Sequence, residues 1–259
     1  MTLYCRFAHN NAVRYGIMDG DRIQAIEGDI FGERTPAGEA IGLADCRLLA
    51  PLVPGTILAA AVNYQSHVPS GSAVLKEDGA PQVPQLFLKP ASSVIGPGDT
   101  IVLLAEARRV DAEGELVAVI GRECRKVAEA DAQGYIFGYT CGNDVSARHW
   151  QRDDIQWWRA KGSDTFSPLG PVIATDLDPA KLRLRTLVNG EVRQDSDTGQ
   201  LIHSIAKMIA FASQVMTLRP GDLLFTGTPG EPPKLEDGDV VDIEIEGIGT
   251  LTNPVRREA

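Results

Sequence analysis

The 259-residue sequence lacks the marks of several protein classes. Its four cysteines are scattered and form no CxxC pair, so neither a disulfide framework nor a zinc ribbon is expected. No apolar run approaches the roughly 20 residues that a membrane-spanning helix needs, and the first residues lack the pattern of a signal peptide. The sequence therefore predicts a cytoplasmic protein with reduced cysteines and no membrane partner.

Positive charge is also scarce. Lysine and arginine number 25 against 35 aspartate and glutamate residues, which gives a net charge of -10. Such a charge repels phosphate backbones, so nucleic acid is not expected as a partner. The sequence has no GK[ST] loop, no GxSxG elbow, no HExxH pair and no dinucleotide fingerprint. An anionic substrate would therefore need a local cluster of cationic side chains.

Turn-forming residues are plentiful, with 26 glycines and 16 prolines, as is typical of a chain with many short strands. Three short alternating segments separated by turn residues predict a hairpin or meander at the N-terminus, and Pro51 and Pro54 follow it. We therefore expect a mixed α/β, β-rich fold. It would consist of a small N-terminal α+β domain, mostly strands, over residues 1–52, and a larger domain over residues 53–259.

Periodicity predicts several elements of the larger domain. Residues 57–62, 115–120 and 135–141 predict buried strands, and residues 127–135 a short helix. Apolar side chains at helical spacing over residues 201–215 predict the clearest helix, with Asp197 or Thr198 as its N-cap. Asn189-Gly190 between two apolar runs predicts a hairpin turn.

Two carboxylates stand at the start of one predicted strand. Glu113 and Glu115 lie two residues apart, directly before the apolar run of residues 116–120. In an extended strand alternate side chains share a face, so both carboxylates would point the same way. Like charges held so close are unfavourable unless a cation joins them. The alternative is a solvated acidic patch on the surface.

Asp144 follows the predicted strand of residues 135–141 and would complete a site of three carboxylates. Ligation by oxygen alone suits Mg²⁺, Mn²⁺ or Ca²⁺ and argues against zinc. Taken alone, the Asn143-Asp144 pair is at least as compatible with a turn or a helix cap.

Cationic and polar side chains follow Asp144. Arg148 and Gln151 are three residues apart and would face the same way on a helix or turn, and Lys161 comes ten residues later. Arginine offers a forked donor to a carboxylate, and lysine offers a point charge to a developing oxyanion. These residues fit an anionic substrate, although an ordinary set of surface salt bridges is equally compatible with them.

Two further candidates end predicted strands. His67 follows a buried strand at the start of a long loop of residues 67–84, a suitable place for a general base, although a lone histidine is more often structural. Thr228 lies in Thr226-Gly227-Thr228-Pro229-Gly230 and could present a hydroxyl group and backbone N–H groups to a carboxylate. A plain Gly-Pro turn is the alternative.

Seven motifs in one order over residues 56–255 resemble those of the fumarylacetoacetate hydrolase family, in particular its bacterial branch of acylpyruvate hydrolases and hydroxyhepta-dienedioate isomerases. The motifs are Asn63-Tyr64-x-x-His67, Leu86-Phe87-Leu88-Lys89-Pro90, Glu113-x-Glu115-Leu116, Gly138-Tyr139-Thr140-x-x-Asn143-Asp144-Val145-Ser146-Ala147-Arg148, Lys161-x-x-Asp164-x-Phe166-x-Pro168-Leu169-Gly170-Pro171, Val188-Asn189-Gly190-Glu191, and Leu218-x-Pro220-Gly221-Asp222 with Thr226-Gly227-Thr228-Pro229. Each motif is weak alone, but seven in order are specific.

The resemblance implies a β-roll catalytic domain behind a small N-terminal domain, usually in a homodimer. It implies Mg²⁺ or Mn²⁺ on the three carboxylates, with Ca²⁺ as a further option. It also implies roles for the other candidates: His67 as the base that activates water, Lys161 as the cation that stabilises an enolate, and Arg148, Gln151 and Thr228 as holders of substrate oxygens. Lys89 matches a family position without a role that the sequence assigns.

Two departures from the family pattern concern the reaction. Many members that act on small acylpyruvates place a glutamate three residues after the histidine, where this sequence has Ser70. Glu77, later in the same loop, is the candidate to replace it as a catalytic residue. The usual Gly-Val-Gly after the Gly-Thr-Pro motif is also absent, and Gly230-Glu231-Pro232-Pro233 stands there.

The function expected from this resemblance is metal-dependent C–C hydrolysis of a small acylpyruvate with release of pyruvate. The alternative is isomerisation or decarboxylation of a 2-hydroxymuconate-type acid in aromatic catabolism, for example 5-carboxymethyl-2-hydroxymuconate or 2-hydroxyhepta-2,4-diene-1,7-dioate. Ser70 in place of the glutamate favours the alternative. A third hypothesis is an inactive binding protein on the same fold. In each case the ligand is a small anionic 2-keto or 2-hydroxy-dienoic acid.

Overall fold

The computed structural model describes residues 1–67 and 81–258. Strands dominate, and helices are few and short, so the predicted mixed, β-rich fold class is confirmed. The N-terminal strands are β1 (Thr2–His9), β2 (Ala12–Asp19), β3 (Arg22–Gly28), β4 (Arg34–Pro36), β5 (Ile41–Gly42) and β6 (Arg47–Leu49), with one 3-10 turn, Leu43–Asp45.

The larger part of the chain carries fourteen further strands among the described residues. They are β7 (Ile57–Ala60), β8 (Leu86–Lys89), β9 (Val94–Ile95), β10 (Ile101–Leu103), β11 (Val110–Asp111), β12 (Gly114–Ile120), β13 (Ile136–Asn143), β14 (Ser146–Ala147), β15 (Ser167–Thr175), β16 (Arg183–Val188), β17 (Glu191–Asp197), β18 (Leu223–Phe225), β19 (Val240–Ile245) and β20 (Gly249–Arg257). The α-helices are α1 (Arg148–Asp153), α2 (Trp158–Gly162) and α3 (Ile205–Ser213). The 3-10 helices are Gln65–His67, Ala91–Ser93, Glu129–Tyr135, Pro179–Lys181 and Thr198–Gln200.

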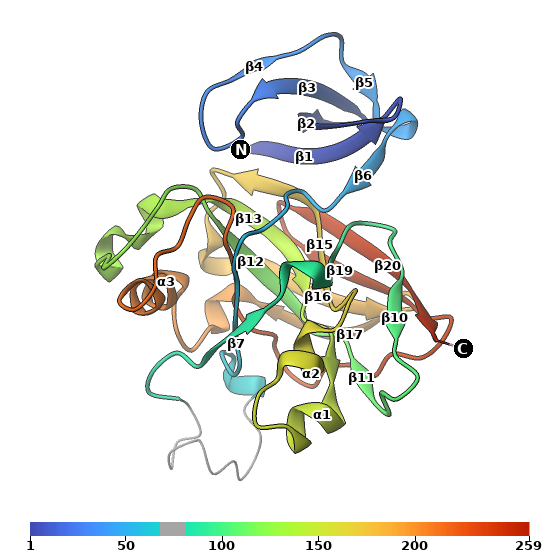
Figure 1. The fold of residues 1–259 in the computed structure, drawn as a ribbon, viewed down its shortest axis with the longest axis vertical. Coiled ribbons are helices and arrows are strands. Elements are labelled where there is room, and N and C mark those ends of the chain that lie inside the picture. The colour runs from blue at the N-terminus through green and yellow to red at the C-terminus, as the bar shows by residue number, and fades with distance from the viewer. Residues whose placement is uncertain (68–80, 259) are drawn as a thin grey trace.

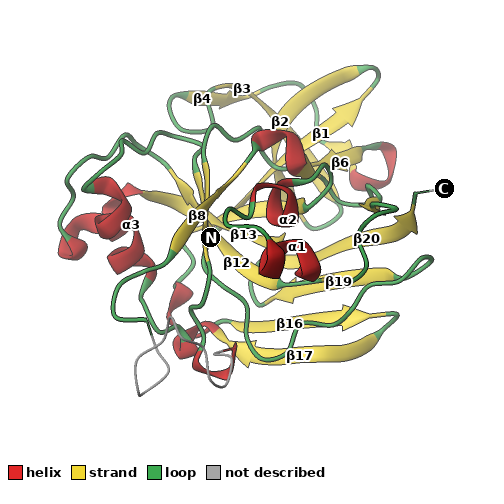
Figure 2. Cartoon of the chain, turned by 60° about the horizontal axis from the view of Figure 1, so that its bottom comes forward, coloured by secondary structure: helices red, strands yellow, loops and turns green. Residues whose placement is uncertain are grey.

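Two sheets make up most of the molecule. The main path of the large sheet runs β4-β3-β2-β1-β15-β13-β12-β18-β7-β8, and a second sheet runs β10-β20-β19-β16-β17. In Figure 2 the last four of these second-sheet strands lie side by side, and helices α1 and α2 lie in front of the ends of β12 and β13. The two sheets therefore enclose the interior, and the short helices cover one end of it.

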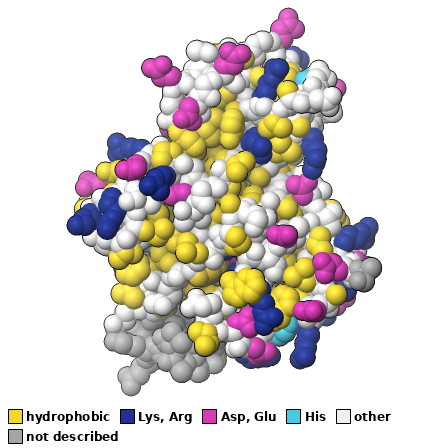
Figure 3. Space-filling model, in the orientation of Figure 1, with side chains coloured by type: hydrophobic (Ala, Val, Ile, Leu, Met, Phe, Trp, Pro, Cys, Tyr) yellow, Lys and Arg dark blue, Asp and Glu magenta, His cyan; other side chains and the backbone are white. Residues whose placement is uncertain are grey.

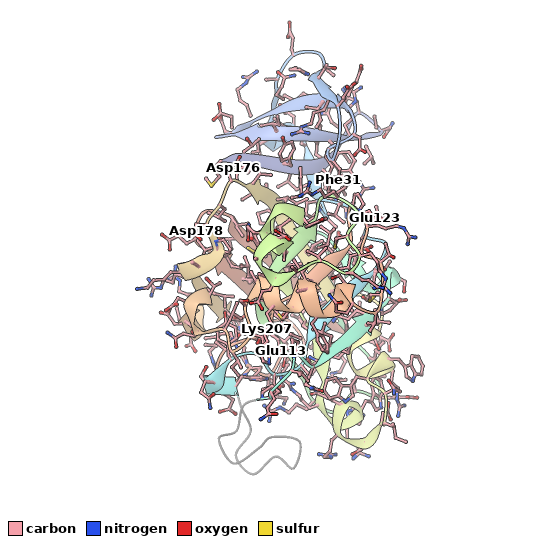
Figure 4. All side chains as sticks on the ribbon, turned by 90° about the vertical axis from the view of Figure 1, so that its left-hand side faces the viewer. Phe31, Glu113, Glu123, Asp176, Asp178 and Lys207 are labelled. Carbon is pink, nitrogen blue, oxygen red and sulfur yellow. The ribbon has the colours of Figure 1, made fainter. Side chains whose placement is uncertain are left out.

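The N-terminal strands form a separate layer at one end of the molecule (Figure 1). The layer is joined to the rest because β1 pairs antiparallel with β15. Phe31, labelled in Figure 4, also packs on Phe137 of the larger part, with ring centroids 5.0 Å apart. Because one sheet continues across this junction, a domain division at residues 52 and 53 stays a prediction.

Strand β12 is buried along its whole length, which explains why its sequence is a continuous apolar run rather than an alternating one. Leu116, Ala118 and Ile120 face one hydrophobic core, whereas Val117 and Val119 face another. A strand with a core on each face is held firmly in place, so it is a rigid base for side chains at its ends.

The expected helix of residues 201–215 is shorter than predicted and begins later. Leu201 instead bridges to Tyr64, and the N–H of Ile202 donates to the carbonyl of Asn63 at 2.8 Å. Helix α3 therefore starts only after Ser204, whose hydroxyl oxygen accepts a hydrogen bond from the N–H of Lys207 at 3.0 Å. Asp197 caps the 3-10 helix Thr198–Gln200 rather than α3.

Other local predictions are confirmed or refined. The Asn189-Gly190 turn joins β16 and β17, and both residues have positive φ, as a type I′ hairpin requires. The short helix expected over residues 127–135 is a 3-10 helix, Glu129–Tyr135. No helix among the described residues is long and apolar enough to cross a membrane. On the face in Figure 3, basic and acidic side chains are interspersed among apolar ones.

Substituting Gly142 of β13 tests how tightly this core is packed. A Cβ at this position would lie 2.5 Å from side-chain atoms of both Phe225 and Val117, closer than atoms can approach. We expect Gly142→Ala to lower the free energy of unfolding by about 1–3 kcal/mol, measured by denaturant titration. The matched control is Gly32→Ala, because the nearest atom to a Cβ there is 3.6 Å away. Equal stability of the two variants would contradict the tight packing around β12.

Candidate metal centre and active site

Glu113 and Glu115 flank the first residue of β12 and are almost fully buried, with exposed fractions of 3% and 1%. They occupy the same alternate positions as Val117 and Val119, so their side chains continue the face that these valines present. Figure 4 shows Glu113 in the half of the molecule away from the N-terminal strands. The sequence-based prediction of a shared face agrees with this placement, and the alternative of a solvated patch is wrong.

Hydrogen bonds of the backbone hold Asp144 beside Glu113 and Glu115. The N–H of Asp144 donates to the carbonyl of Glu113 at 2.9 Å, and the N–H of Glu113 donates to the side-chain oxygen of Asn143 at 2.9 Å. These bonds extend the antiparallel pairing of β12 with β13 past the strand ends. One oxygen from each of Glu113, Glu115 and Asp144 can be chosen so that all three lie within 4.8 Å of one another.

Gly114, between the two glutamates, lets the second sheet approach this point. A Cβ on Gly114 would lie 2.2 Å from the hydroxyl oxygen of Thr186 on β16 and 3.1 Å from Ile243 on β19. Any larger residue would push the two sheets apart at the level of the carboxylates. The Glu-Gly-Glu sequence therefore combines two acidic side chains on one face with close packing on the other.

Two buried lysines approach the carboxylates from other parts of the chain. The ammonium group of Lys161, in α2, donates to Glu113 and to Asp144 at 2.6 Å each. Lys89, at the end of β8, donates to the other oxygen of Asp144 and to the carbonyl of Phe166 at 2.9 Å. The structure thus gives Lys89 a contact that the sequence did not predict.

Arg148 opens helix α1 and joins three polar side chains. It donates to Glu113 at 2.6 Å, to Asp111 at 2.7 Å and to the side-chain oxygen of Gln151 at 2.9 Å. The predicted proximity of Arg148 and Gln151 is therefore confirmed. Asp111 was missed, although it continues the alternation of Glu115 and Glu113 by one more step and could have been found by it.

His67 ends the 3-10 helix that follows β7. Its Nδ1 lies 2.7 Å from the carbonyl oxygen of Gly230, and its Nε2 lies 3.8 Å from a carboxylate oxygen of Glu113. A carbonyl oxygen only accepts, so Nδ1 carries the hydrogen and Nε2 is the atom that faces the acidic cluster. The other loop candidate, Glu77, lies outside the described residues.

The loop after β18 closes the site. The N–H of Gly227 donates to Glu115 at 2.7 Å, and Gly227 has a φ of +100°, with Asn63 2.8 Å from where a Cβ would be. Thr228 follows and is buried, and its hydroxyl oxygen accepts a hydrogen bond from the amide of Gln194 at 3.0 Å. Gln194 on β17 was also missed, since its charged and polar neighbours in the sequence give no signal that it is buried.

Burial and neighbouring charges shift the pKa values of these groups, and for Glu113 and Lys161 the two effects oppose each other. Burial, together with Asp144 and Glu113, raises the pKa of Glu115 well above its ordinary value. Burial alone would also raise the pKa of Glu113, but Arg148, Lys161 and His67 outweigh it and lower that pKa. Burial would lower the pKa of Lys161, but Asp144 and Glu113 raise it. Of the two glutamates, Glu115 is therefore the one whose negative charge the surrounding cations stabilise less.

The carboxylate cluster fits a hard divalent cation. All three donors are oxygens, they converge on one point, and they are buried, which is costly for like charges without a cation between them. Ligand sets of this kind suit Mg²⁺, Mn²⁺ or Ca²⁺. The fold and the cluster together define a β-rich protein with a candidate metal centre next to a histidine, two lysines and an arginine.

Comparison with known families agrees with this description. Residues 56–256 match the C-terminal domain of fumarylacetoacetate (FAA) hydrolase, and residues 3–51 match a domain described as Rv2993c-like, N-terminal. The chain therefore belongs to the fumarylacetoacetate hydrolase family, as its motifs indicated. The fold predicted from that resemblance is confirmed as well.

Several known proteins and solved structures are similar to this chain over most of their length. Protein Rv2993c of Mycobacterium tuberculosis is 47% identical over 98% of this chain and 97% of its own. The structure of 5-carboxymethyl-2-hydroxymuconate delta-isomerase from Mycobacterium smegmatis is 48% identical, with a TM-score of 0.92 and complete coverage of both chains. Oxaloacetate tautomerase fahd2 of Xenopus laevis is 41% identical over 80% of this chain and 68% of its own.

A more distant structure carries a metal. Maleylpyruvate hydrolase from Sphingobium sp. SYK-6, in complex with manganese (II) ion and pyruvate, is 33% identical, with a TM-score of 0.81 and complete coverage of both chains. Members of the family therefore include isomerases, tautomerases and hydrolases of small acids, and the family alone does not choose between these reactions.

Removing one carboxylate tests the candidate metal centre. We expect Glu115→Ala to abolish Mn²⁺ binding measured by isothermal titration calorimetry, because one of three ligands is lost, while the protein still unfolds cooperatively. Asp195→Ala is the control, since Asp195 is an exposed carboxylate paired with Arg183. Unchanged Mn²⁺ affinity in the Glu115 variant would refute its assignment as a ligand.

The raised pKa of Glu115 predicts a pH dependence. In the metal-free protein this carboxylate keeps its proton at pH values above the ordinary pKa of a glutamate. A cation that binds there must displace that proton. We therefore expect Mn²⁺ affinity to rise with pH and binding to release protons. Calorimetry in two buffers of different ionisation enthalpy measures that release. Affinity independent of pH between about 5 and 7 would show that Glu115 is already ionised.

Proposed function

We propose that this chain is a divalent-metal-dependent enzyme that moves a proton on a small 2-oxo acid, and so interconverts keto and enol forms or shifts a double bond. The observation that carries the proposal is the orientation of His67. Its Nδ1–H donates to the Gly230 carbonyl, and its Nε2 faces the carboxylate cluster. An imidazole held in this way accepts a proton at Nε2 whenever that nitrogen carries none, and it can return the proton.

Each side chain of the site has a part in this chemistry. A divalent cation held by the three carboxylates, Mg²⁺ or Mn²⁺ in this proposal, would act as a Lewis acid toward the keto and carboxylate oxygens of the substrate. The ammonium group of Lys161 lies beside the same carboxylates and stabilises negative charge that develops on the keto oxygen. His67 takes the proton from the neighbouring carbon and delivers it to a second position.

Two polar side chains, Gln151 and Thr228, would hold the carboxylate of the substrate. The side-chain oxygen of Gln151 accepts from Arg148, which leaves the amide nitrogen of Gln151 to donate to a substrate oxygen. Thr228 adds a hydroxyl group from the loop after β18. These residues give an otherwise acidic protein a local set of donors for an anion, as the charge balance of the sequence requires.

Hydrolysis of an acylpyruvate, the function favoured from the sequence, is the second candidate. The likeness to maleylpyruvate hydrolase supports it. Hydrolysis also needs a water molecule to be activated, and among residues 1–67 and 81–258 the partner of His67 Nδ1 is a backbone carbonyl rather than a carboxylate. For this reason we place proton transfer first. The homodimer implied by the family resemblance stays a prediction.

Product analysis distinguishes the reactions. The Mn²⁺-loaded protein is expected to accelerate keto–enol exchange of 2-oxo dicarboxylic acids such as oxaloacetate, followed by NMR as deuterium uptake next to the keto group. Pyruvate release from an acylpyruvate would establish hydrolysis instead, and CO₂ release decarboxylation. No turnover across such a panel would leave the hypothesis of an inactive binding protein standing.

Substituting His67 tests the observation on which the proposed function rests. We expect His67→Ala to slow exchange by about 10²- to 10⁴-fold, because the proton then has no positioned acceptor, while Mn²⁺ affinity stays close to that of the unaltered protein. The control is His9→Ala, since His9 lies in the N-terminal hairpin and contacts Asp45. An exchange rate of the His67 variant within a factor of a few of the control would exclude His67 as the base.

A further inference from the structure

Gln194 is the one buried residue of strand β17, and it stands between the exposed Arg193 and Asp195. A buried amide loses its hydrogen bonds to water, so its retention in a strand core position requires partners in the protein. All of its partners belong to the site described above. The amide nitrogen contacts Thr228 and Pro229, and the amide oxygen faces the N–H of Gly114 at 3.4 Å.

The contact with Pro229 fixes which way the amide points. The carbonyl oxygen of Pro229, 2.5 Å from the amide, can only accept a hydrogen bond, so the atom facing it is the nitrogen of Gln194. The same nitrogen lies 3.0 Å from the hydroxyl oxygen of Thr228. The hydroxyl oxygen of Thr228 is therefore the acceptor of this bond, and its own proton is directed elsewhere.

We propose that Gln194 is a positioning residue that turns the hydroxyl group of Thr228 into a hydrogen-bond donor toward the carboxylate of the substrate. A hydroxyl group can donate or accept, and an anion requires a donor. Among the hydrogen bonds of the described residues, none uses the proton of Thr228. Because Gln194 donates to the oxygen, rotation of the hydroxyl that would point the proton at Gln194 is unfavourable.

The position of the loop places Thr228 close to the carboxylate cluster. Gly227, next to Thr228, donates to Glu115 at 2.7 Å, so the threonine lies one residue from a contact with the carboxylate cluster. Gln194 also lines a cavity of about 530 Å³, but the lining of this cavity includes the acidic Asp195, Asp197 and Glu231 and does not include Thr228. An anion would therefore be held by the Thr228 hydroxyl and not by the cavity. Loss of the Gln194 amide would change the orientation of the Thr228 hydroxyl. It would not remove a group that touches the three carboxylates.

This inference rests on the proposed function, and a binding measurement separates the two. The probe is oxalate, which resembles the carboxylate and keto group of a 2-oxo acid, titrated into Mn²⁺-loaded protein by calorimetry. We expect Gln194→Leu and Thr228→Val each to weaken oxalate binding by about tenfold, and the double variant to be no weaker than Thr228→Val alone. Thr228→Ser, which keeps the hydroxyl, is expected to retain binding.

The control is Gln200→Leu, the same substitution at an exposed glutamine that lines the same cavity, and it is expected to leave oxalate affinity unchanged. Gln194→Met serves in place of Gln194→Leu if the leucine variant fails to fold cooperatively. Additive losses in the double variant, or an unchanged affinity of the Gln194 variant, would overturn the positioning role. Absence of oxalate binding to the unaltered Mn²⁺-loaded protein would overturn the proposed function and this inference with it.

Discussion

The site depends on the burial of three carboxylates within 4.8 Å of one another at the end of one strand pair. Two lysines and an arginine reach them from β8, α1 and α2, and every one of these cations makes a charged hydrogen bond to at least one of the carboxylates. Buried charges of one sign are tolerated only with such partners. The packing of β12 between two cores supplies the rigidity that keeps the cluster together.

The carboxylates lie on a rigid strand pair, whereas the residues around them come from several different elements. The three carboxylates lie in or directly beside β12 and β13. His67, Thr228 and Gln194 come from the end of a 3-10 helix, a loop and the edge strand of the second sheet. In the function that we propose, the carboxylates select a class of substrate, an acid with a neighbouring keto oxygen. In the same proposal, His67, Thr228 and Gln194 decide where a proton or a water molecule is delivered. This division fits a family that contains isomerases, a tautomerase and a hydrolase.

The local sequence pattern predicted a residue's environment correctly where that environment depends on the residue's own segment. The shared face of Glu113 and Glu115 follows from the period of a strand, and the turn at Asn189-Gly190 follows from positive φ at both positions. Local pattern failed for helix α3, because Asn63 and Tyr64, well over a hundred residues away, bind the backbone of residues 201 and 202 and delay the helix. Helical spacing carries no information about such a competing partner.

By itself the sequence determined the fold class, the family and the identity of the three carboxylates, because strand periodicity and ordered motifs are local properties. Only the tertiary structure decided that Lys89 pairs with Asp144, that Gln194 is buried against Thr228, and that a backbone carbonyl orients His67. These contacts join residues between 34 and 163 positions apart. Contacts between residues so far apart in the sequence depend on how the sheets pack, and no single segment encodes that packing.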